Sequence, residues 1–252
     1  MRNVSIVIIV KNEEKNIRDC IESLRWSDEI VVVDSGSTDN TVAICREAGC
    51  TVICTEWLGF GRTWQLAVEH AKNEWVLPIA ADERVSTELA QAIQNLGETP
   101  SGLAGYKIRR ISRYLGKPIR HCGWQNDYPL RLFRKDSGQF NSEAVHESVE
   151  VDGGVGMLRE PIIHFPYPDI ESHIAKINQY TTLGARMLHE KGKTTSLPAA
   201  ILRGCSKFLK MYLLRGGILD GSHGLVLSLV SAFGVSLKYL KLWNLRGLKD
   251  GG

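Results

Sequence analysis

The sequence predicts an α/β fold with a mostly parallel central sheet, an antiparallel extension and C-terminal helices. Three observations lead to this. Apolar, β-branched runs alternate with helical patterns through the first third of the chain. Strand-like pieces separated by Gly- and Pro-containing turns follow from about Gly102. Helical periodicity then dominates after Pro168. The 252 residues suffice for one large α/β domain with an appendage.

The first third predicts four strands and three helices. The run at Val4–Val10 is continuously apolar, which is typical of a strand covered on both faces. In the helix expected at 13–25, Ile17, Cys20, Ile21 and Leu24 share one face. The other strands are expected at 29–33 (ending at Asp34), Thr51–Cys54 and 75–79, and the other helices at 40–48 and 62–72.

A βαβ series of this kind implies right-handed crossovers and a parallel sheet. Ligands of such sheets bind beyond the carboxyl ends of the strands. The loops 11–14, 34–41 and 80–84 all lie at that edge. Short antiparallel strands are expected farther on, at 104–109, 130–133 and 162–165, followed by a helix at 169–191 and one or two helices over 198–243, interrupted around Gly216–Gly217 and Gly221–Gly224.

Charge is distributed unevenly along the chain. The net charge is +3, which gives no indication of nucleic-acid binding. From Ile201 onward there are eight basic and two acidic residues, or +6, which leaves −3 for the first 200 residues. Such a difference indicates a surface partner for the tail.

Cysteine usage and the N-terminal run favour a cytosolic enzyme. The six cysteines form no CxxC and no Cys/His grouping with zinc spacing, so we expect reduced thiols. The apolar run Val4–Val10 ends in charged residues without a small-residue cleavage site, so we expect a strand there and no signal peptide.

The loop after the second strand reads EIVVVDSGSTDNT, residues 29–41. On propensity alone, Asp34 either accepts hydrogen bonds from a ligand or shapes a helix-capping turn. The loop resembles D-x-G-S-x-D-x-T of family 2 glycosyltransferases, which have a GT-A fold, and SIVIIVKNEEKNI resembles the opening strand of that family. The resemblance implies that Asn12, Glu13, Asp34 and Asp39 bind the nucleobase and ribose of a sugar-nucleotide donor.

The segment WVLPIAADERVS, residues 75–86, resembles the family segment whose D-x-D holds the donor diphosphate through a divalent metal. Ala80 stands where the first aspartate would be, and Asp82 remains as the expected ligand of Mg²⁺ or Mn²⁺. The alternative is a helix-capping aspartate. Glu83 either supports Asp82 or is a first-turn helix acid. Arg62, in LGFGR, either pairs with donor phosphate or is an exposed helix-start arginine.

Two later motifs supply the expected acceptor side. GWQNDYPLRLFRK, residues 123–135, is similar to a segment of the lipopolysaccharide-core members of the family, in which Asp127 would orient or deprotonate the acceptor. Arg131 and Arg134 either face phosphates or lie on a strand surface. AVHE ends in Glu147, the expected general base, with Asp127 as the second candidate. His146 is a ligand, an acceptor contact or a core histidine, and His164 is a weaker metal candidate.

The resemblance is strong over residues 3–150 and extends weakly to about 245, where SKFLKMYLLRGGILDG looks like the tail of bacterial lipopolysaccharide core glucosyltransferases. It implies inverting transfer of a hexose, glucose by analogy, from a UDP-sugar to an inner-core sugar. Transfer to a polyprenyl phosphate and a catalytically silent nucleotide-sugar-binding protein remain alternatives. A Rossmann dehydrogenase is disfavoured because KNEEKN follows the first strand where GxGxxG would be required.

We therefore expect a catalytic domain at 1–195, with a donor half at 1–100 and an acceptor half at 101–168, and a basic amphipathic tail at 196–252. The apolar stretch 224–237 has 14 residues, fewer than the roughly 20 that a spanning helix needs. The tail is expected to lie on an anionic membrane surface at the inner face of the inner membrane, near a lipid-linked saccharide acceptor. The alternatives are packing on the catalytic domain and a contact between two copies.

Overall fold

The computed structural model describes residues 4–96, 102–141 and 148–247. The chain divides into two compact units. The first unit comprises Met1–Arg110 and Asp127–His164, and the second comprises Ile111–Asn126 and Phe165–Gly252. The expected boundary at residue 195, between a catalytic domain and a basic tail, stays a prediction.

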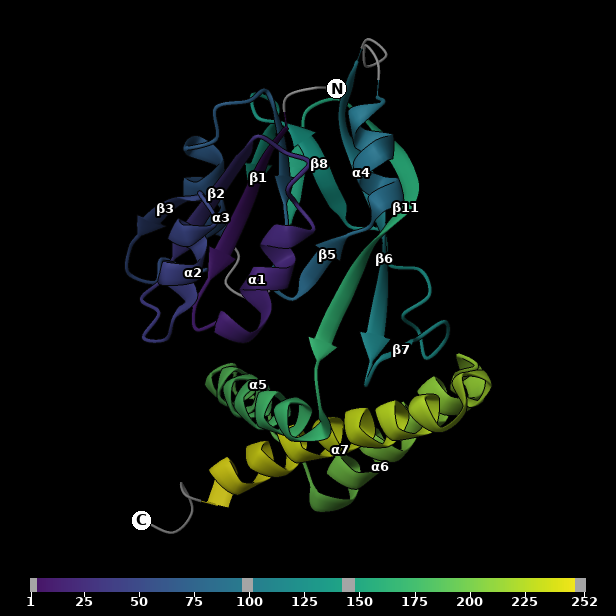
Figure 1. Ribbon diagram of the computed structural model, residues 1–252. Coiled ribbons are helices and arrows are strands. Elements are labelled where there is room, and N and C mark those ends of the chain that lie inside the picture. The colour runs from purple at the N-terminus through teal and green to yellow at the C-terminus, as the bar shows by residue number, and fades with distance from the viewer. Residues whose placement is uncertain (1–3, 97–101, 142–147, 248–252) are drawn as a thin grey trace. The chain divides into compact units, whose positions relative to one another are not determined.

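The donor half of the first unit has the predicted parallel sheet. Its strands are β1 (Val4–Val10), β2 (Glu29–Asp34), β3 (Thr51–Cys54) and β4 (Trp75–Pro78), in the order β3-β2-β1-β4. Neighbouring strands pair in parallel, with Val10 opposite Asp34 and Val7 opposite Pro78. Three helices connect them, namely α1 (Glu14–Glu22), α2 (Thr41–Glu47) and α3 (Phe60–Glu69), as Figure 1 shows. The carboxyl ends of β1, β2 and β4 therefore meet at one edge.

An antiparallel extension continues the same sheet. The strand β8 (Leu130–Arg134) pairs antiparallel with β4 and with β6 (Leu103–Tyr114). The order then continues through β11 (Gly154–Tyr167) to β5 (Glu83–Val85). A loop was expected at 80–84, but residues 83–85 pair antiparallel with residues 162–164 of β11. The helix α4 (Thr87–Gln94), which was not expected, starts at Ser86, whose hydroxyl accepts a hydrogen bond from the amide of Leu89.

Three short strands complete the set. The strands β9 (Gly138–Phe140) and β10 (Val149–Val151) form a separate antiparallel pair in the first unit. The strand β7 (Lys117–Pro118) pairs with the end of β6 in the second unit.

The first unit is buried on both faces of its sheet. Side chains alternate between the two faces of a strand, so β1 contributes Ile6 and Ile8 to one core cluster and Val7 to the other. The first cluster includes Ile17 of α1 and Leu89 of α4, whereas the second includes Trp64 of α3. Two-sided burial explains why β1, β2 and β4 are apolar without alternation.

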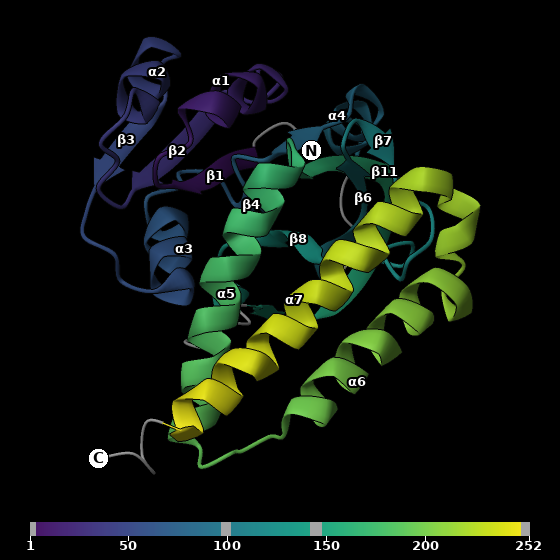
Figure 2. The ribbon, with the colours of Figure 1, turned by 90° about the horizontal axis from the view of Figure 1, so that it is seen from below.

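The second unit is mainly helical. It contains α5 (Ile170–Glu190), α6 (Leu197–Leu209), a π-helical turn (Lys210–Leu214), a 3₁₀ turn (Gly217–Asp220) and α7 (Gly221–Gly247). Figure 2 shows α7 lying between α5 and α6. Gly204 of α6 faces Ser236 and the backbone of Ala232 on α7, where a larger side chain would collide. Gly216, with φ of 68°, makes the interruption that the sequence predicts between the helices.

The last helix is longer than its apolar stretch of 14 residues suggests. Together with the preceding turn it spans residues 217–245, which is long and apolar enough to cross a membrane by length and composition alone. The amino group of Lys241 on α7 donates hydrogen bonds to α5, to Asn178, Thr181 and Thr182. Core helices of soluble proteins pass the same test.

Candidate active site

The loops after β1 and β2 are joined by hydrogen bonds. The side-chain oxygen of Asn12 accepts a hydrogen bond from the amide of Thr38 at 2.8 Å, and the amide of Asn12 donates to the hydroxyl of Ser37 at 2.8 Å. Asn12 has φ of 57°, a conformation that asparagine tolerates better than most residues. The Asn12 side chain is therefore committed to holding the second loop at the edge of the sheet.

Asp34 is buried at the end of β2 and shapes its own loop. Its carboxylate accepts hydrogen bonds from the amides of Gly36 and Ser37, each 3.0 Å from Oδ2. Gly36 has φ of 85°, which the turn requires. This is the turn-shaping role that propensity alone allows, and the donor-binding role of Asp34 stays a prediction.

Glu13 and Asp39 lie on the two sides of the same junction. The hydroxyl of Thr41 accepts a hydrogen bond from the amide of Glu13 at 2.8 Å, and Asp39 accepts one from the amide of Glu14 at 3.2 Å. Burial alone would raise the pKa of Asp39, but hydrogen bonds from Thr41 and from the Glu14 amide outweigh it and lower that pKa. Asn12, Glu13, Asp34 and Asp39 are thus brought together, as the sequence predicts.

The segment after β4 places one carboxylate inside the first unit and one near its surface. Glu83 is fully buried, and its Oε2 accepts a hydrogen bond from the amide of Ala80 at 2.9 Å. Asp82 is partly exposed, and its Oδ2 lies 3.4 Å from Nε2 of His164 on β11. Asp82 and His164, which the sequence proposes as metal ligands, are therefore neighbours.

Glu83 organises two arginines. Its Oε1 lies 3.0 Å from Nη1 of Arg110 on β6 and 3.0 Å from Nη2 of Arg131 on β8. Burial would raise the pKa of Glu83, but the charges of Arg131 and Arg110, with a smaller contribution from His164, lower it overall. The carboxylate is therefore ionised, and it holds the two arginines and the Ala80 turn. Glu83 lies in β5, ahead of α4, so it is not a first-turn helix acid, and its support of Asp82 stays a prediction.

Arg110 extends this network to Asp127. Its Nε donates to Oδ2 of Asp127 at 2.7 Å, and its amide donates to the Asp127 carbonyl at 2.8 Å. No local sequence pattern distinguishes Arg110 from the neighbouring Arg109. Arg110 becomes a candidate site residue through its hydrogen bonds to Glu83, 27 positions away, and Asp127, 17 positions away.

A pocket of about 280 Å³ lies over this network in the first unit. Arg110 and Arg131 contribute its charged groups, and Trp64 and Phe140 contribute aromatic ones. The Nε atom of Arg131 is buried and has no hydrogen-bond partner among the described residues. A buried donor without a partner is costly, so this guanidinium is suited to meet an oxygen of a bound molecule.

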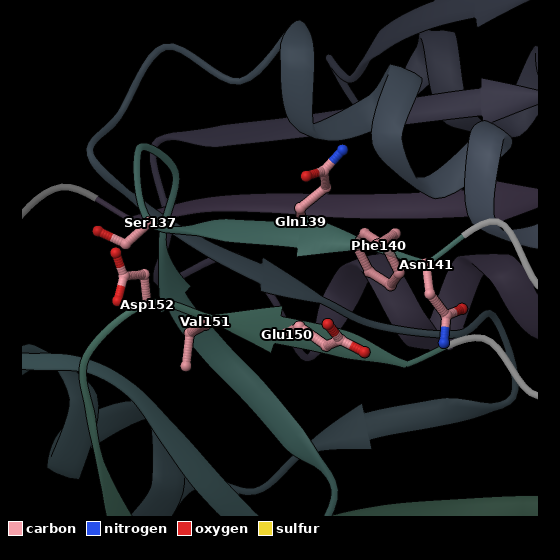
Figure 3. Close-up of a pocket in the computed structure, with 7 residues that line it drawn as sticks. All are labelled: Ser137, Gln139, Phe140, Asn141, Glu150, Val151 and Asp152. Carbon is pink, nitrogen blue, oxygen red and sulfur yellow. The ribbon is translucent and has the colours of Figure 1, made fainter.

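A second hollow, of about 630 Å³, lies along the β9–β10 pair. Figure 3 shows its polar lining, with Ser137 and Asp152 at one end and Asn141 at the other. Phe140 lines both hollows. The lining of hydroxyl, amide and carboxylate groups is of the kind that hydrogen-bonds sugar hydroxyls.

The remaining candidates are placed as follows. Glu147 and His146 lie outside the described residues. Arg62 is exposed in the first turn of α3. Arg134 forms surface ion pairs with Glu74 at 2.6 Å and Asp136 at 3.2 Å, which matches the alternative of a strand-surface charge. The six cysteines form no disulfide in the structure, and their redox state stays a prediction.

The described residues contain no group of three or more His, Cys, Asp or Glu side chains arranged to hold a metal ion. Mg²⁺ and Mn²⁺ in nucleotide sites are commonly held by one or two carboxylates together with substrate phosphates. The partly exposed Asp82, with His164 beside it, fits that smaller requirement. Ala80 offers no side-chain ligand, so a donor diphosphate would have to complete the coordination.

Comparisons with known proteins agree with this arrangement. The profile of glycosyl transferase family 2 matches residues 5–165. The lipopolysaccharide core biosynthesis glycosyltransferase LpsC of Rhizobium meliloti is 31% identical, covering 98% of this chain and 94% of its own length. An uncharacterized glycosyltransferase of Rickettsia typhi is 32% identical, covering 98% of this chain and 88% of its own.

Among solved structures, a mannosyltransferase of Pyrobaculum calidifontis, determined with GDP-Man and Mn²⁺, superposes with a TM-score of 0.52 at 17% identity, over 99% of this chain and 88% of that chain. At this identity the likeness shows the fold, which is of the GT-A type. The expected fold class is thereby confirmed. The family profile and the full-length relatives show that the chain belongs to glycosyl transferase family 2.

Proposed function

We propose that this glycosyltransferase moves a hexose, with glucose as the first candidate, from a UDP-sugar to an inner-core sugar of lipopolysaccharide, with inversion at the anomeric carbon. The observation that carries the proposal is the convergence of the three loops after β1, β2 and β4 at one edge of a parallel sheet, where α/β proteins bind nucleotides. Similarity to LpsC along nearly the whole chain supports the choice of acceptor.

The donor is proposed to bind along that edge. Asp34 and Asp39 would meet the ribose and the base, together with Asn12 and Glu13, and Asp82 would hold Mg²⁺ or Mn²⁺. When bound, the metal offsets charge on the departing diphosphate. Arg131 is proposed to bind a donor oxygen because its Nε atom is buried next to a pocket and lacks a partner among the described residues. Arg62 is proposed to pair with a phosphate.

The transfer is a single displacement. An acceptor hydroxyl oxygen forms a bond to the anomeric carbon while the bond from that carbon to the phosphate oxygen breaks, and UDP leaves with the electron pair. A carboxylate accepts the hydroxyl proton. Glu147 is the proposed base and Asp127 the second candidate. Asp127 is held in place by its ion pair with Arg110, which suits it to orienting the acceptor.

The tail is proposed to hold the enzyme at the inner face of the inner membrane, where a lipid-linked acceptor is made. The +6 charge of residues 201–252 and the apolar length of α7 support this. A contact between two copies through the tail is the alternative. A polyprenyl-phosphate acceptor is a second candidate, and Ala80 favours a protein that binds donors without turning them over.

Screening nucleotide sugars for protection against thermal unfolding tests the proposed donor. We expect UDP-glucose with Mn²⁺ to raise the melting temperature more than GDP-mannose does. Asp34→Ala should abolish this shift, and Asp34→Asn, which retains one acceptor oxygen for the Gly36 and Ser37 amides, controls for loss of loop structure. An unchanged shift in both variants would remove Asp34 from the site, and protection by GDP-sugars alone would overturn the UDP assignment.

A further inference from the structure

The connection between α6 and α7 carries a concentration of exposed apolar side chains. Five leucine and isoleucine residues within 209–219 are at least half exposed: Leu209, Leu213, Leu214, Ile218 and Leu219. Leu214, at 83%, and Leu219, at 72%, are the two most exposed large apolar side chains of the described residues. We call these five residues the leucine tip. Exposed apolar groups gathered in this way mark interaction sites.

The backbone beneath the leucine tip is firmly held within the second unit. Met211 and Gly217 are buried between the exposed residues, and Met211 belongs to a core cluster with Tyr114 and Leu227. Asp220 accepts hydrogen bonds from the amides of Arg120 and His121, at 3.1 and 2.9 Å. The exposure of the leucines is therefore imposed by a packed turn and does not come from a frayed helix end.

The charge around the leucine tip has one sign. Residues 191–219 contain six basic residues and no acidic one. Lys210 and Arg215 are exposed, and Lys207 lies close enough that, besides burial, their positive charges lower its pKa. The carboxylate at the end of the tip, Asp220, is nearly buried and engaged by His121. The surface thus presents leucines next to uncompensated cations.

Two further features argue against α7 as a membrane-spanning helix. Lys241, in its second half, is engaged with α5 through four hydrogen bonds. Leu227 and Ser228, in its first half, are fully buried within the protein. Other apolar side chains of the second unit are also exposed, such as Leu202 on α6 and Phe233 on α7, but the two most exposed ones belong to the leucine tip. The tip is short enough to enter a headgroup region and too short to cross a bilayer.

We propose that the leucine tip inserts into the headgroup and upper acyl region of an anionic lipid bilayer, with Lys210 and Arg215 meeting lipid phosphates. Apolar insertion combined with basic residues is the pattern by which interfacial segments bind anionic membranes. The inference deepens the proposed function and rests on it, because a lipid-linked acceptor gives this contact its use. It identifies which part of the second unit contacts the lipid.

Vesicle flotation of the full chain tests the proposal. The apolar variant is Leu214→Ser with Leu219→Ser, and its matched control is Val155→Ser with Met157→Ser, which removes two exposed apolar side chains from β11. The basic variant is Lys210→Gln with Arg215→Gln. Wild type and control should float with vesicles containing anionic lipid. The apolar variant should bind at least about tenfold more weakly, and the basic variant should weaken by about tenfold, only on anionic vesicles.

The proposal is overturned if wild type stays unbound at low salt, or if the apolar variant floats as well as the control. It is also overturned if wild type ignores vesicles and sedimentation shows that the apolar variant converts a dimer to a monomer, since the tip would then join two copies. Transfer to a soluble, delipidated oligosaccharide separates the two proposals. The apolar variant should retain wild-type transfer, and absence of wild-type transfer would count against the proposed function while flotation still decides the tip.

Discussion

The Nη1 atom of Arg110 lies 3.0 Å from Oε1 of the fully buried Glu83. Through its Nε atom the same arginine also binds Asp127. Glu83, in the segment after β4, thus helps to fix the position of Asp127, the second candidate for the general base, through Arg110. Removing one partner of a buried ion pair costs more than the pair contributes, because a desolvated charge remains.

Glu83→Gln should therefore lower the free energy of unfolding by about 3 kcal/mol. The neutral amide would leave two arginines, one-quarter exposed or less, without their shared carboxylate. The matched control is Glu74→Gln, which removes the carboxylate of the exposed pair with Arg134 and should cost less than about 1 kcal/mol. Denaturant titration measures both, and equal effects of the two variants would contradict the role assigned to Glu83.

A buried histidine should make the second unit sensitive to acid. Burial, with a smaller contribution from the charge of Lys176, lowers the pKa of His173 to about 4, while its Nδ1 lies 3.0 Å from the hydroxyl of Tyr114. Because the unfolded state takes up a proton near its ordinary pKa of 6.5 and the folded state does not, stability falls as pH drops from 6.5 toward 4.

At pH 5 this difference amounts to about 2 kcal/mol. Unfolding titrations at pH 7 and pH 5 should show the loss in the wild type and in His189→Gln, which alters a partly exposed histidine. His173→Phe should lose stability at both pH values, because it gives up the contact with Tyr114, but should show about 2 kcal/mol less pH dependence. If the stability of His173→Phe depends on pH as steeply as that of the wild type, groups other than His173 cause the pH dependence.

Most of the parallel sheet could be predicted from the sequence, and several later elements could not. Strands buried on both faces are continuous apolar runs, so the limits of β1 agree with expectation. The limits of the partly exposed edge strand β3 agree as well. The strand β5 has three residues and exists through pairing with β11, far along the chain, so it has no local signal. The helix α4 did have one, since Ser86 precedes Leu89, Ala90 and Ile93 at helical spacing.

The candidate site shows the same division. Asp34 and Asp39 lie within one loop, where the family resemblance singled them out, and their donor-binding roles stay predictions. Glu83 was expected only as a support for Asp82 or a helix acid, because its partners Arg110 and Arg131 come from distant strands. The full burial of Glu83 has no local sequence signal, because it depends on strands far along the chain. The choice between Arg109 and Arg110 likewise requires knowing which face of β6 is covered.

Ala80→Asp tests whether the missing carboxylate limits metal binding. In the family pattern a first aspartate stands here, and the new side chain should raise Mn²⁺ affinity or activity in the presence of donor. Asp82→Asn should weaken metal dependence strongly in either background. Metal titration followed by UDP release measures both. Lower activity of Ala80→Asp in an intact fold would show that this chain uses a different arrangement, for example because the Ala80 amide must keep its hydrogen bond to Glu83.

The identity of the base is decided by two conservative variants. Glu147→Gln should lower kcat by roughly 10²–10⁴-fold with little change in donor binding, as expected for loss of a general base. Asp127→Asn should have a smaller effect on kcat and a larger one on KM for the acceptor, because Arg110 holds Asp127 in place as an orienting group. If Asp127→Asn abolishes turnover and Glu147→Gln does not, the two roles are exchanged.

The most direct test of the central claim is transfer from UDP-glucose, labelled with ¹³C at the anomeric carbon, to a lipopolysaccharide truncated at the inner core. The enzyme should release UDP only when the acceptor and a divalent ion, Mg²⁺ or Mn²⁺, are both present. The product should give the anomeric NMR signal of a β-linkage, opposite to the α-configured donor. Tight donor binding without any transfer, or a product that retains the α-configuration, would contradict this claim.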